Sequence, residues 1–388
     1  MPFAARTGFF SVSGEAPPPP AGDTIWYDIT GSEWTGNASS FSQSGAPNQY
    51  NITVSEFGGN NFRYRSGVLH PNGNIYYPPR SSASGMLEFD PVNRTTSYLT
   101  YGDLSLTTGT SGNAWFHSAC LTESGNILCI PFHIDEIIQV DPVAGTAVAM
   151  TDTYGGQAKW SGGVLGQNGN VYCIPQNYNG VLEIDPVNDA TTVHTYGISM
   201  SGSTKWWGGY RSPKDDRIYC APLLFGSVLV IAPDGQSATT ETYGQTFSTG
   251  TNAHYGACGD KFGNVVMIQG DTTPSKVINP DNNTAFNFTV TGATYGGVTG
   301  ADGNVYTVPK GQSVERVDLS SGNSTPSVYS LGTLTTNRMA ATTALNGNIY
   351  IAPDINFTTM FEIDVNADMT ITNQSNLILS PYFKTSKI

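Results

Sequence analysis

One sequence pattern recurs seven times along this chain, and it limits the possible folds more than any other feature. Its clearest copies run from 65 to 93 (RSGVLHPNGNIYYPP, then GMLEFDPVN) and from 161 to 188 (SGGVLGQNGNVYCIP, then GVLEIDPVN). A turn residue marks the copies at intervals of 40 to 52 residues: Gly73, Gly125, Gly169, Asp216, Gly263, Gly303 and Gly347. A second landmark follows each of these by 15 to 17 residues: Asp90, Asp141, Asp185, Ala232, Asn279, Asp318 and Asp364. Because both landmarks stay in register, the pattern indicates one structural unit built seven times.

Each copy contains four short runs of β-branched and aromatic residues separated by turn residues, which predicts four antiparallel strands. The Asn-Gly between the first two runs favours a tight hairpin, and the Asp-Pro after the third favours a turn in which Pro fixes φ. Four strands in roughly 45 residues, with no helix between them, are typical of a propeller blade. We therefore predict an all-β, seven-bladed β-propeller over 62–388, with a sandwich or an open β-solenoid as the alternative.

The sequence leaves the closure of this ring open. The last copy contains every strand-like run, in TTALNGNIYIAP, MFEID and MTITNQ, so it need not borrow a strand from the N-terminal part. TIWYDIT at 24–30 could nevertheless provide one. We expect residues 24–61 to form extra strands and a loop leading into the ring.

The five cysteines are an odd number in a long chain and do not predict a disulfide framework. Three of them occupy one repeat position, where a small buried thiol packs well. Cys120 and Cys129 flank one predicted turn and could form a disulfide across the hairpin, although free buried thiols fit the same positions.

Composition excludes several classes of protein. The chain has 17 Lys and Arg against 30 Asp and Glu, a net charge of −13, with only 12% charged residues. This acidic balance, without a basic block, argues against a nucleic-acid binder. No apolar run reaches the roughly 18 residues that a membrane span needs, and the first 25 residues lack the apolar core of a secretory signal.

The N-terminal segment lies outside the repeat. Residues 1–23 contain Phe3, Phe9 and Phe10, followed by a stiff spacer at Pro17–Pro20. Such a short arm cannot bury its own aromatic rings. We interpret it as an anchor that docks the propeller onto a larger assembly, with a disordered tail as the alternative.

The three residues before the first strand of each blade, which we call the slot, are the candidate binding site. The innermost strand of a blade runs along the central axis, so the slots should meet at one rim of the channel. They collect four of the six Trp residues and five of the 17 cations. Aromatic rings beside donors suit a sugar or an acidic polysaccharide, although the same side chains could plug the channel. The candidates are Arg63, Tyr64, Arg65, Trp115, His117, Lys159, Trp160, Lys205, Trp206, Trp207, His254, Tyr255, Tyr295 and Arg338.

Signatures of catalysis are weak. The five His form no metal-ligand spacing, so we expect no metal and no cofactor. The repeated Asp of DPV recurs at a turn and is interpreted as structural. His117 or His254 could act as a base in the slot, but only their position suggests it.

The repeat GGVLxxNGNVYxIP…VLEIDPVN resembles one found in uncharacterised proteins of bacteriophages and some microbes. The opening MPFAARTGFFS with its proline spacer is similar to the N-termini of structural proteins of marine and cyanobacterial phages. The resemblance implies a virion structural protein, present in several copies and held by other virion proteins through residues 1–20. We expect a tail fibre or adhesin that presents the propeller to a host glycan. A capsid decoration protein, an enzyme acting on polysaccharides or lactones, and a free lectin are the alternatives.

Overall fold

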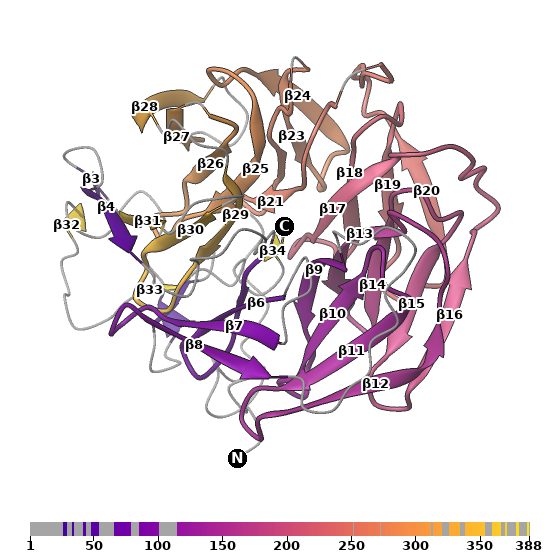
Figure 1. Cartoon of the computed structure of the whole chain (residues 1–388). Helices are drawn as coiled ribbons and strands as arrows, with labels where there is room; N and C mark the ends of the chain where they lie inside the picture. The colour runs from indigo at the N-terminus through magenta and orange to yellow at the C-terminus, as the bar shows by residue number, and fades with distance from the viewer. Residues whose placement is uncertain are drawn as a thin grey trace.

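The computed structural model describes residues 26–28, 33–34, 42–43, 48–53, 66–78, 85–100, 115–250, 252–271, 273–311, 313–319, 326–333, 338–353, 359–365, 369–370, 378–379 and 386–387. Over these residues the chain forms strands and turns without a helix, and so no helix that could cross a membrane. Seven antiparallel sheets follow one another around a ring, as the repeat predicted. Figure 1 shows β9, β13 and β17 on the inside of the ring and β12, β16 and β20 on the outside. The protein is a seven-bladed β-propeller.

The first four blades have these strands in chain order: β5 (Val68–Leu69), β6 (Ile75–Tyr77), β7 (Gly85–Asp90) and β8 (Thr95–Thr100); β9 (Phe116–Leu121), β10 (Ile127–Pro131), β11 (Glu136–Asp141) and β12 (Thr146–Thr153); β13 (Trp160–Leu165), β14 (Val171–Pro175), β15 (Val181–Asp185) and β16 (Ala190–His194); β17 (Trp206–Arg211), β18 (Ile218–Pro222), β19 (Val228–Ile231) and β20 (Ala238–Glu241). In blade 4, β34 (Ser386–Lys387) adds a fifth strand beside β17.

The last three blades are built in the same way: β21 (Cys258–Gly259), β22 (Val265–Met267), β23 (Ser275–Asn279) and β24 (Thr284–Phe288); β25 (Thr294–Thr299), β26 (Val305–Pro309), β27 (Ser313–Asp318) and β28 (Ser327–Thr333); β29 (Arg338–Thr343), β30 (Ile349–Pro353), β31 (Thr359–Asp364) and β4 (Asn48–Thr53). Short strands outside the blades also pair: β1 (Trp26–Asp28) with β2 (Glu33–Trp34) and β33 (Ile378–Leu379), and β3 (Ser42–Gln43) with β32 (Met369–Thr370).

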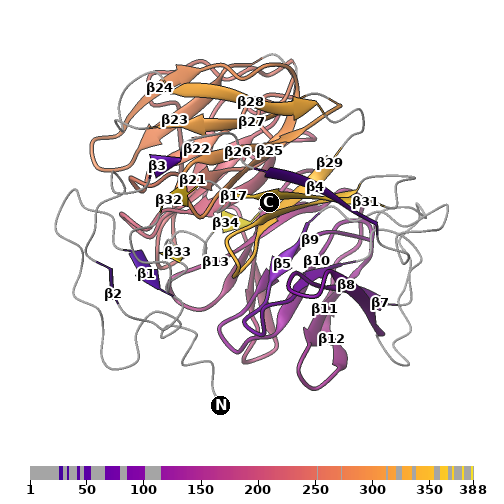
Figure 2. The ribbon, with the colours of Figure 1, turned by 90° about the vertical axis from the view of Figure 1, so that its left-hand side faces the viewer.

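The N-terminal part closes the ring. The outer strand of blade 7 is β4, which pairs with β31 from Thr359↔Thr53 to Asp364↔Asn48. Figure 2 shows β4, in indigo, beside the yellow β31. Neither candidate from the sequence fills this place: Met369–Thr370, within MTITNQ, pairs with β3, and Trp26–Asp28, within TIWYDIT, pairs with β2 and β33.

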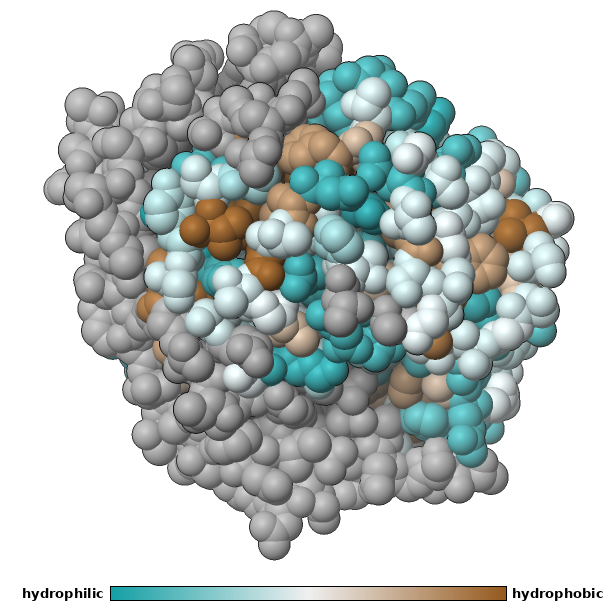
Figure 3. Space-filling view, turned by 90° about the horizontal axis from the view of Figure 1, so that it is seen from above, coloured by the Kyte–Doolittle hydropathy of each residue, from teal (hydrophilic) through white to brown (hydrophobic). Residues whose placement is uncertain are grey.

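The hydrophobic core lies between neighbouring blades. One cluster joins Leu128 and Ile137 of blade 2 to Trp160 and Leu182 of blade 3, all fully buried. Because neighbouring blades cover both faces of each sheet, the second strand of a blade is buried along its whole length, as in the apolar β14. Polar residues occur mainly on the outer strands, and Figure 3 shows a mostly pale and teal face with separate brown residues.

The predicted Cys120–Cys129 disulfide is wrong. In the β9–β10 hairpin Cys120 pairs with Leu128, while Cys129 pairs with Ala119. Successive strand residues point to opposite faces, so the two thiols enter different core clusters. None of the five cysteines forms a disulfide and all are buried, and burial raises the pKa of Cys173, Cys220 and Cys258.

The repeated Asp of DPV is a turn residue, as predicted. The carboxylate of Asp185 accepts the backbone N–H groups of Val187 and Asn188, each at 3.0 Å. Asp90 and Asp141 make the same bonds in blades 1 and 2. The recurrence of this Asp therefore follows from turn geometry.

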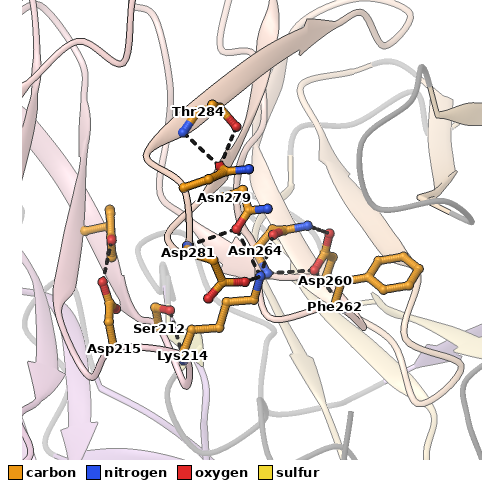
Figure 4. Close-up of polar contacts among 11 residues, drawn as sticks. Ser212, Lys214, Asp215, Asp260, Phe262, Asn264, Asn279, Asp281 and Thr284 are labelled. Atoms are coloured by element: carbon orange, nitrogen blue, oxygen red, sulfur yellow. Dashed lines mark hydrogen bonds and ion pairs between the residues drawn. The ribbon is translucent and has the colours of Figure 1, made fainter. Parts of the chain in front are cut away.

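A polar seam, buried at Asp260 and Asn264 and exposed at Asp281, joins blades 4 and 5 at the rim that carries the hairpin turns (Figure 4). Lys214 Nζ donates to Asn264 Oδ1 and Asn279 Oδ1, each at 3.1 Å, and lies 2.6 Å from Asp281 Oδ2. Asn264 Nδ2 in turn donates to Asp260 Oδ2 at 2.9 Å. Burial raises the pKa of Asp260 to about 6, although Lys214 opposes this shift.

Candidate functional site

A register shift in the innermost hairpin creates the site. In blade 2, Phe116 pairs with Pro131 and Ser118 with Ile130, so His117 is the extra residue at this register shift. Blade 3 repeats the shift around Ser161, and blade 4 repeats it around Trp207 and Gly208. Such a β-bulge bends the strand, and the side chain of the extra residue no longer follows the alternation of side chains between the two faces of the sheet.

The bulged residue is the third slot residue in every blade where the shift is recorded: His117, Ser161, Trp207, Tyr295 and Met339. In blade 5 the same slot position is Tyr255, between the His254↔Gln269 bridge and β21. In blades 2 to 6 the third slot position thus departs from the alternation of its neighbours along the strand.

Four of these side chains form what we call the mouth cluster: His117, Trp207, Tyr255 and Tyr295. The ring centroids of His117 and Trp207 lie 4.2 Å apart. Trp207 lies 5.1 Å from Tyr255, which lies 5.2 Å from Tyr295. Blades 2 and 4 are not neighbours, so His117 and Trp207 can touch only close to the axis of the ring. Trp207 and Tyr295 remain half-buried, whereas Tyr255 is 7% and His117 4% exposed.

Polar groups border the cluster on blades 5 and 6. Lys310 Nζ lies 5.4 Å from the centroid of the Tyr295 ring and 2.9 Å from Asp271 Oδ1. Asn252 Nδ2 donates to the other carboxylate oxygen of Asp271 at 2.9 Å. His117 Nδ1 lies 3.1 Å from the carbonyl of Ser161. The edge of the cluster therefore offers hydrogen-bonding groups without a large net charge.

The structure corrects the placement of Lys159, Trp160, Lys205 and Trp206 on the rim. Both indoles are fully buried, and each N–H donates within its own blade, Trp160 to Gly180 O and Trp206 to Ser227 O. Both lysines are also buried. Lys159 Nζ donates to the carbonyls of Ile134 and Gly156, and Lys205 Nζ donates to that of Gly202. Burial lowers the pKa of each lysine to about 8. The first two slot positions enter the core because they precede the bulge.

His254 is likewise structural and not a base at the rim. It occupies the repeat position of Trp160 and Trp206, and its Nε2 lies 3.1 Å from the carbonyl of Pro274, just before β23. Burial lowers the pKa of His254 to about 4, so the ring is neutral near pH 7. In blade 5 the imidazole thus makes the hydrogen bond that an indole makes in blades 3 and 4.

Trp115 is the one remaining sequence candidate whose side chain the structure describes. Trp115 packs against the core between blades 1 and 2. Arg63, Tyr64 and Arg65 lie outside the described residues, and so do Phe3, Phe9 and Phe10 of the proposed anchor. Arg338 begins β29, but its side chain is not described.

Sequence reasoning missed Phe132 and Lys310, which lie next to the mouth cluster. The Phe132 ring lies 4.7 Å from that of His117. Both residues directly follow the proline that ends the second strand of a blade, at Pro131 and Pro309. Aligning this position across the repeat would have shown that it reaches the same rim. Over the described ranges no three His, Cys, Asp or Glu side chains gather as metal ligands.

Comparison with known proteins supports the fold and goes no further. No family model and no curated protein match the chain. A virginiamycin B lyase from Staphylococcus aureus, solved as a catalytically inactive His-to-Ala variant with quinupristin, is similar over 82% of this chain and 99% of its own, with a TM-score of 0.60 and 11% identity. The WD40 β-propeller domain of Doa1 matches 84% of this chain and 98% of its own, with a TM-score of 0.54 and 11% identity.

An extracellular domain of a hybrid two-component system from B. thetaiotaomicron is also similar, with a TM-score of 0.60 and 11% identity. This chain is covered over 87% of its length, but the match takes in only 47% of the other chain. Lyase, WD40 and sensor propellers thus share the architecture, and a fold shared this widely does not define a function.

Proposed function

We propose that this protein is a binding module that recognises a neutral carbohydrate through the mouth cluster. The observation that carries the proposal is the convergence of His117, Trp207, Tyr255 and Tyr295 from four blades onto the axis of the ring. Aromatic faces stack on the C–H groups of a pyranose, and nearby polar groups bind its hydroxyls. In this proposal the protein is not an enzyme.

A neutral ligand fits the charges better than an acidic polysaccharide does. Lys159 and Lys205 are buried against carbonyls, and Lys310 is paired with Asp271. The whole chain carries a net charge of −13, which repels an anionic polymer.

Replacing Trp207 with Ala tests the proposal. On an array of neutral and acidic glycans, the wild-type chain is expected to bind neutral glycans. Trp207→Ala should weaken this binding at least tenfold, which corresponds to about 1.4 kcal/mol. Tyr329→Ala is the matched control, because Tyr329 is an exposed aromatic residue on the outer strand β28, and it should change binding less than twofold. Equal losses in both variants, or no glycan bound by the wild type, would reject the proposal.

We place this module on a phage particle, as a tail fibre or adhesin or as a capsid decoration protein. The resemblance of the repeat and of the N-terminal segment supports this setting. Deleting residues 1–20 should abolish incorporation into virions and leave a folded propeller. Antibody labelling of virions in electron micrographs would distinguish tail from capsid, and undiminished incorporation of the deletion variant would count against the anchor.

An enzyme acting on polysaccharides or lactones is the second candidate. His117 favours it, because this residue brings an imidazole into the mouth cluster. Turnover of such a substrate by the wild-type chain that disappears in a folded His117→Ala variant would favour catalysis over binding.

A further inference from the structure

The orientation of the rings in the mouth cluster limits how a glycan can lie on them. The plane of His117 is turned 89° from that of Trp207, and Trp207 is turned 90° from Tyr255. Tyr255 and Tyr295 differ by 64°. The interior of a glycan chain that binds side-on needs neighbouring platforms that face the same way. Here a sugar stacked on one ring would meet the edge of the next, so the cluster presents no row of parallel platforms.

The C-terminal strand limits how deep a ligand can reach. β34 pairs antiparallel with β17 on the inside of the ring, through Gly209↔Lys387 and Tyr210↔Ser386. It also lies next to β13 and β21, the inner strands of blades 3 and 5. Figure 1 shows β34 near the centre of the ring. Gly209 follows Trp207 by two residues, or roughly 7 Å along the strand. A segment of the protein itself therefore occupies the channel directly below the cluster.

Gly208 and Gly209 are consecutive in β17, and Gly208 has a φ of +64°, which glycine adopts without strain. A Cβ added at Gly208 would meet Gly256 of blade 5, and one added at Gly209 would meet Ile174 and Val164 of blade 3. The two glycines therefore let the inner strands of neighbouring blades lie close together at the level where β34 pairs with β17.

We propose that the mouth cluster recognises the terminal residue of a glycan, end-on, and not the interior of the chain. This inference rests on the proposed carbohydrate binding. The perpendicular rings select one sugar, and β34 prevents the glycan from passing further along the axis. The ligand is therefore the exposed end of a neutral glycan. The affinity of the protein for this end should not depend on how many sugars follow it in the glycan.

The experiment uses the full chain and pairs of neutral oligosaccharides. An array of glycans attached through their reducing ends first identifies the bound terminal sugar. Calorimetric titration then compares that oligosaccharide with two derivatives, one lengthened by two residues at the reducing end and one with an extra sugar on the non-reducing end. The first should keep its Kd within twofold, and the second should bind at least tenfold more weakly. Trp207→Ala should lose binding to all three.

The outcomes separate this inference from the function beneath it. Equal affinity for the oligosaccharide and its non-reducing-end extension, with binding still lost in Trp207→Ala, would overturn end-on recognition while keeping carbohydrate binding. Binding that Trp207→Ala leaves unchanged would reject the site itself. A variant that ends at residue 380 tests the floor. It should discriminate against the extended glycan less than threefold, and undiminished discrimination would overturn the role of β34.

Discussion

Trp206 and Trp207 adjoin in the sequence, yet their side chains lie in different environments. The Trp206 indole is fully buried between blades 3 and 4, and its N–H donates to the carbonyl of Ser227 at 2.9 Å. Trp207 sits in the bulge and contacts His117 and Tyr255. The repeat gives both positions a similar sequence context, so only their place relative to the bulge separates a core residue from a candidate binding residue.

Substituting each Trp with Ala should separate stability from binding. Trp206→Ala leaves a large cavity and an unbonded carbonyl, so we expect the free energy of unfolding to fall by roughly 3–5 kcal/mol. Trp207→Ala removes a half-buried side chain and should cost less than half as much. Urea denaturation of both variants checks this, and equal losses would contradict the different environments.

His254 should make stability depend on pH. Burial lowers its pKa in the folded protein to about 4, below the usual 6.5, so the unfolded chain binds more protons between these values. The contribution of the neutral His254 ring to the free energy of unfolding is therefore complete above pH 6.5. It is lost as the pH falls to 4, which lowers the free energy of unfolding by roughly 3 kcal/mol. His254→Gln keeps an N–H donor for Pro274 without titrating. As the pH falls from 6.5 to 4, the free energy of unfolding of the wild type should decrease relative to that of His254→Gln. A difference between the two proteins that stays constant with pH would contradict the burial of a neutral ring.

The titration of Asp260 should change the stability of the fold in the opposite direction over nearly the same pH range. Its folded pKa of about 6 lies above the usual 3.8, so the folded state binds more protons between these values. Its contribution is complete below pH 3.8 and is lost as the pH rises to 6, by roughly 3 kcal/mol. Asp260→Asn removes this titration, so wild type should lose stability relative to the variant between pH 4 and pH 7. Because the two groups oppose each other, we expect the single variants to be more pH-dependent than the wild type.

The inner strand with its bulge is the element on which the candidate site depends. Gly208 lies in the bulge of β17 with a φ of +64°, and a Cβ there would come within 3.2 Å of the Gly256 Cα. The neighbouring inner strands therefore pass each other backbone to backbone at this level. A small residue is needed at this position for steric reasons.

Gly208→Ala should damage both the strand and the site. The positive φ and the contact with Gly256 together should cost roughly 1–3 kcal/mol of stability. The bulge would shift and carry Trp207 with it, so glycan binding should weaken as well. Gly244→Ala is a suitable control, because it has a φ of +68° but no atom within 4 Å of the added Cβ. A Gly208→Ala variant with normal glycan binding would contradict the link between bulge and site.

At the scale of the whole molecule, β4 joins the two ends of the repeat array. Its pairing with β31 covers an edge that would otherwise expose unpaired backbone groups on blade 7. The ring thus depends on residues 48–53, which precede the first blade in the sequence.

Two truncations test this closure. A chain that starts at residue 41 keeps β4 and should unfold close to the wild-type temperature. A chain that starts at residue 54 lacks β4 and should unfold several degrees lower and associate in solution through the exposed edge of β31. Thermal unfolding followed by circular dichroism, with size-exclusion chromatography, measures both effects. Equal melting temperatures for the two truncations would show that β4 does not stabilise the ring.

The sequence by itself determined the number of blades, the four strands of blades 1 to 6 and the turns between them. Those features depend on local chemistry: alternation of apolar residues, Asn-Gly in the hairpins, and an Asp that bonds the N–H groups two and three residues ahead. Asn-Gly stands in three of the seven hairpins and the Asp in five of the seven turns, so the clear copies identify the weaker ones.

Only the tertiary structure decided which slot residues face the axis, which segment closes the ring and whether Cys120 meets Cys129. All three depend on register between strands. A bulge shifts the pairing by one residue and sends Trp206 into the core and Trp207 to the mouth, and a one-residue offset puts the two thiols on opposite faces. Closure by β4 pairs residues more than 300 positions apart. No local pattern encodes such pairings, because they are set by the packing of the blades against one another.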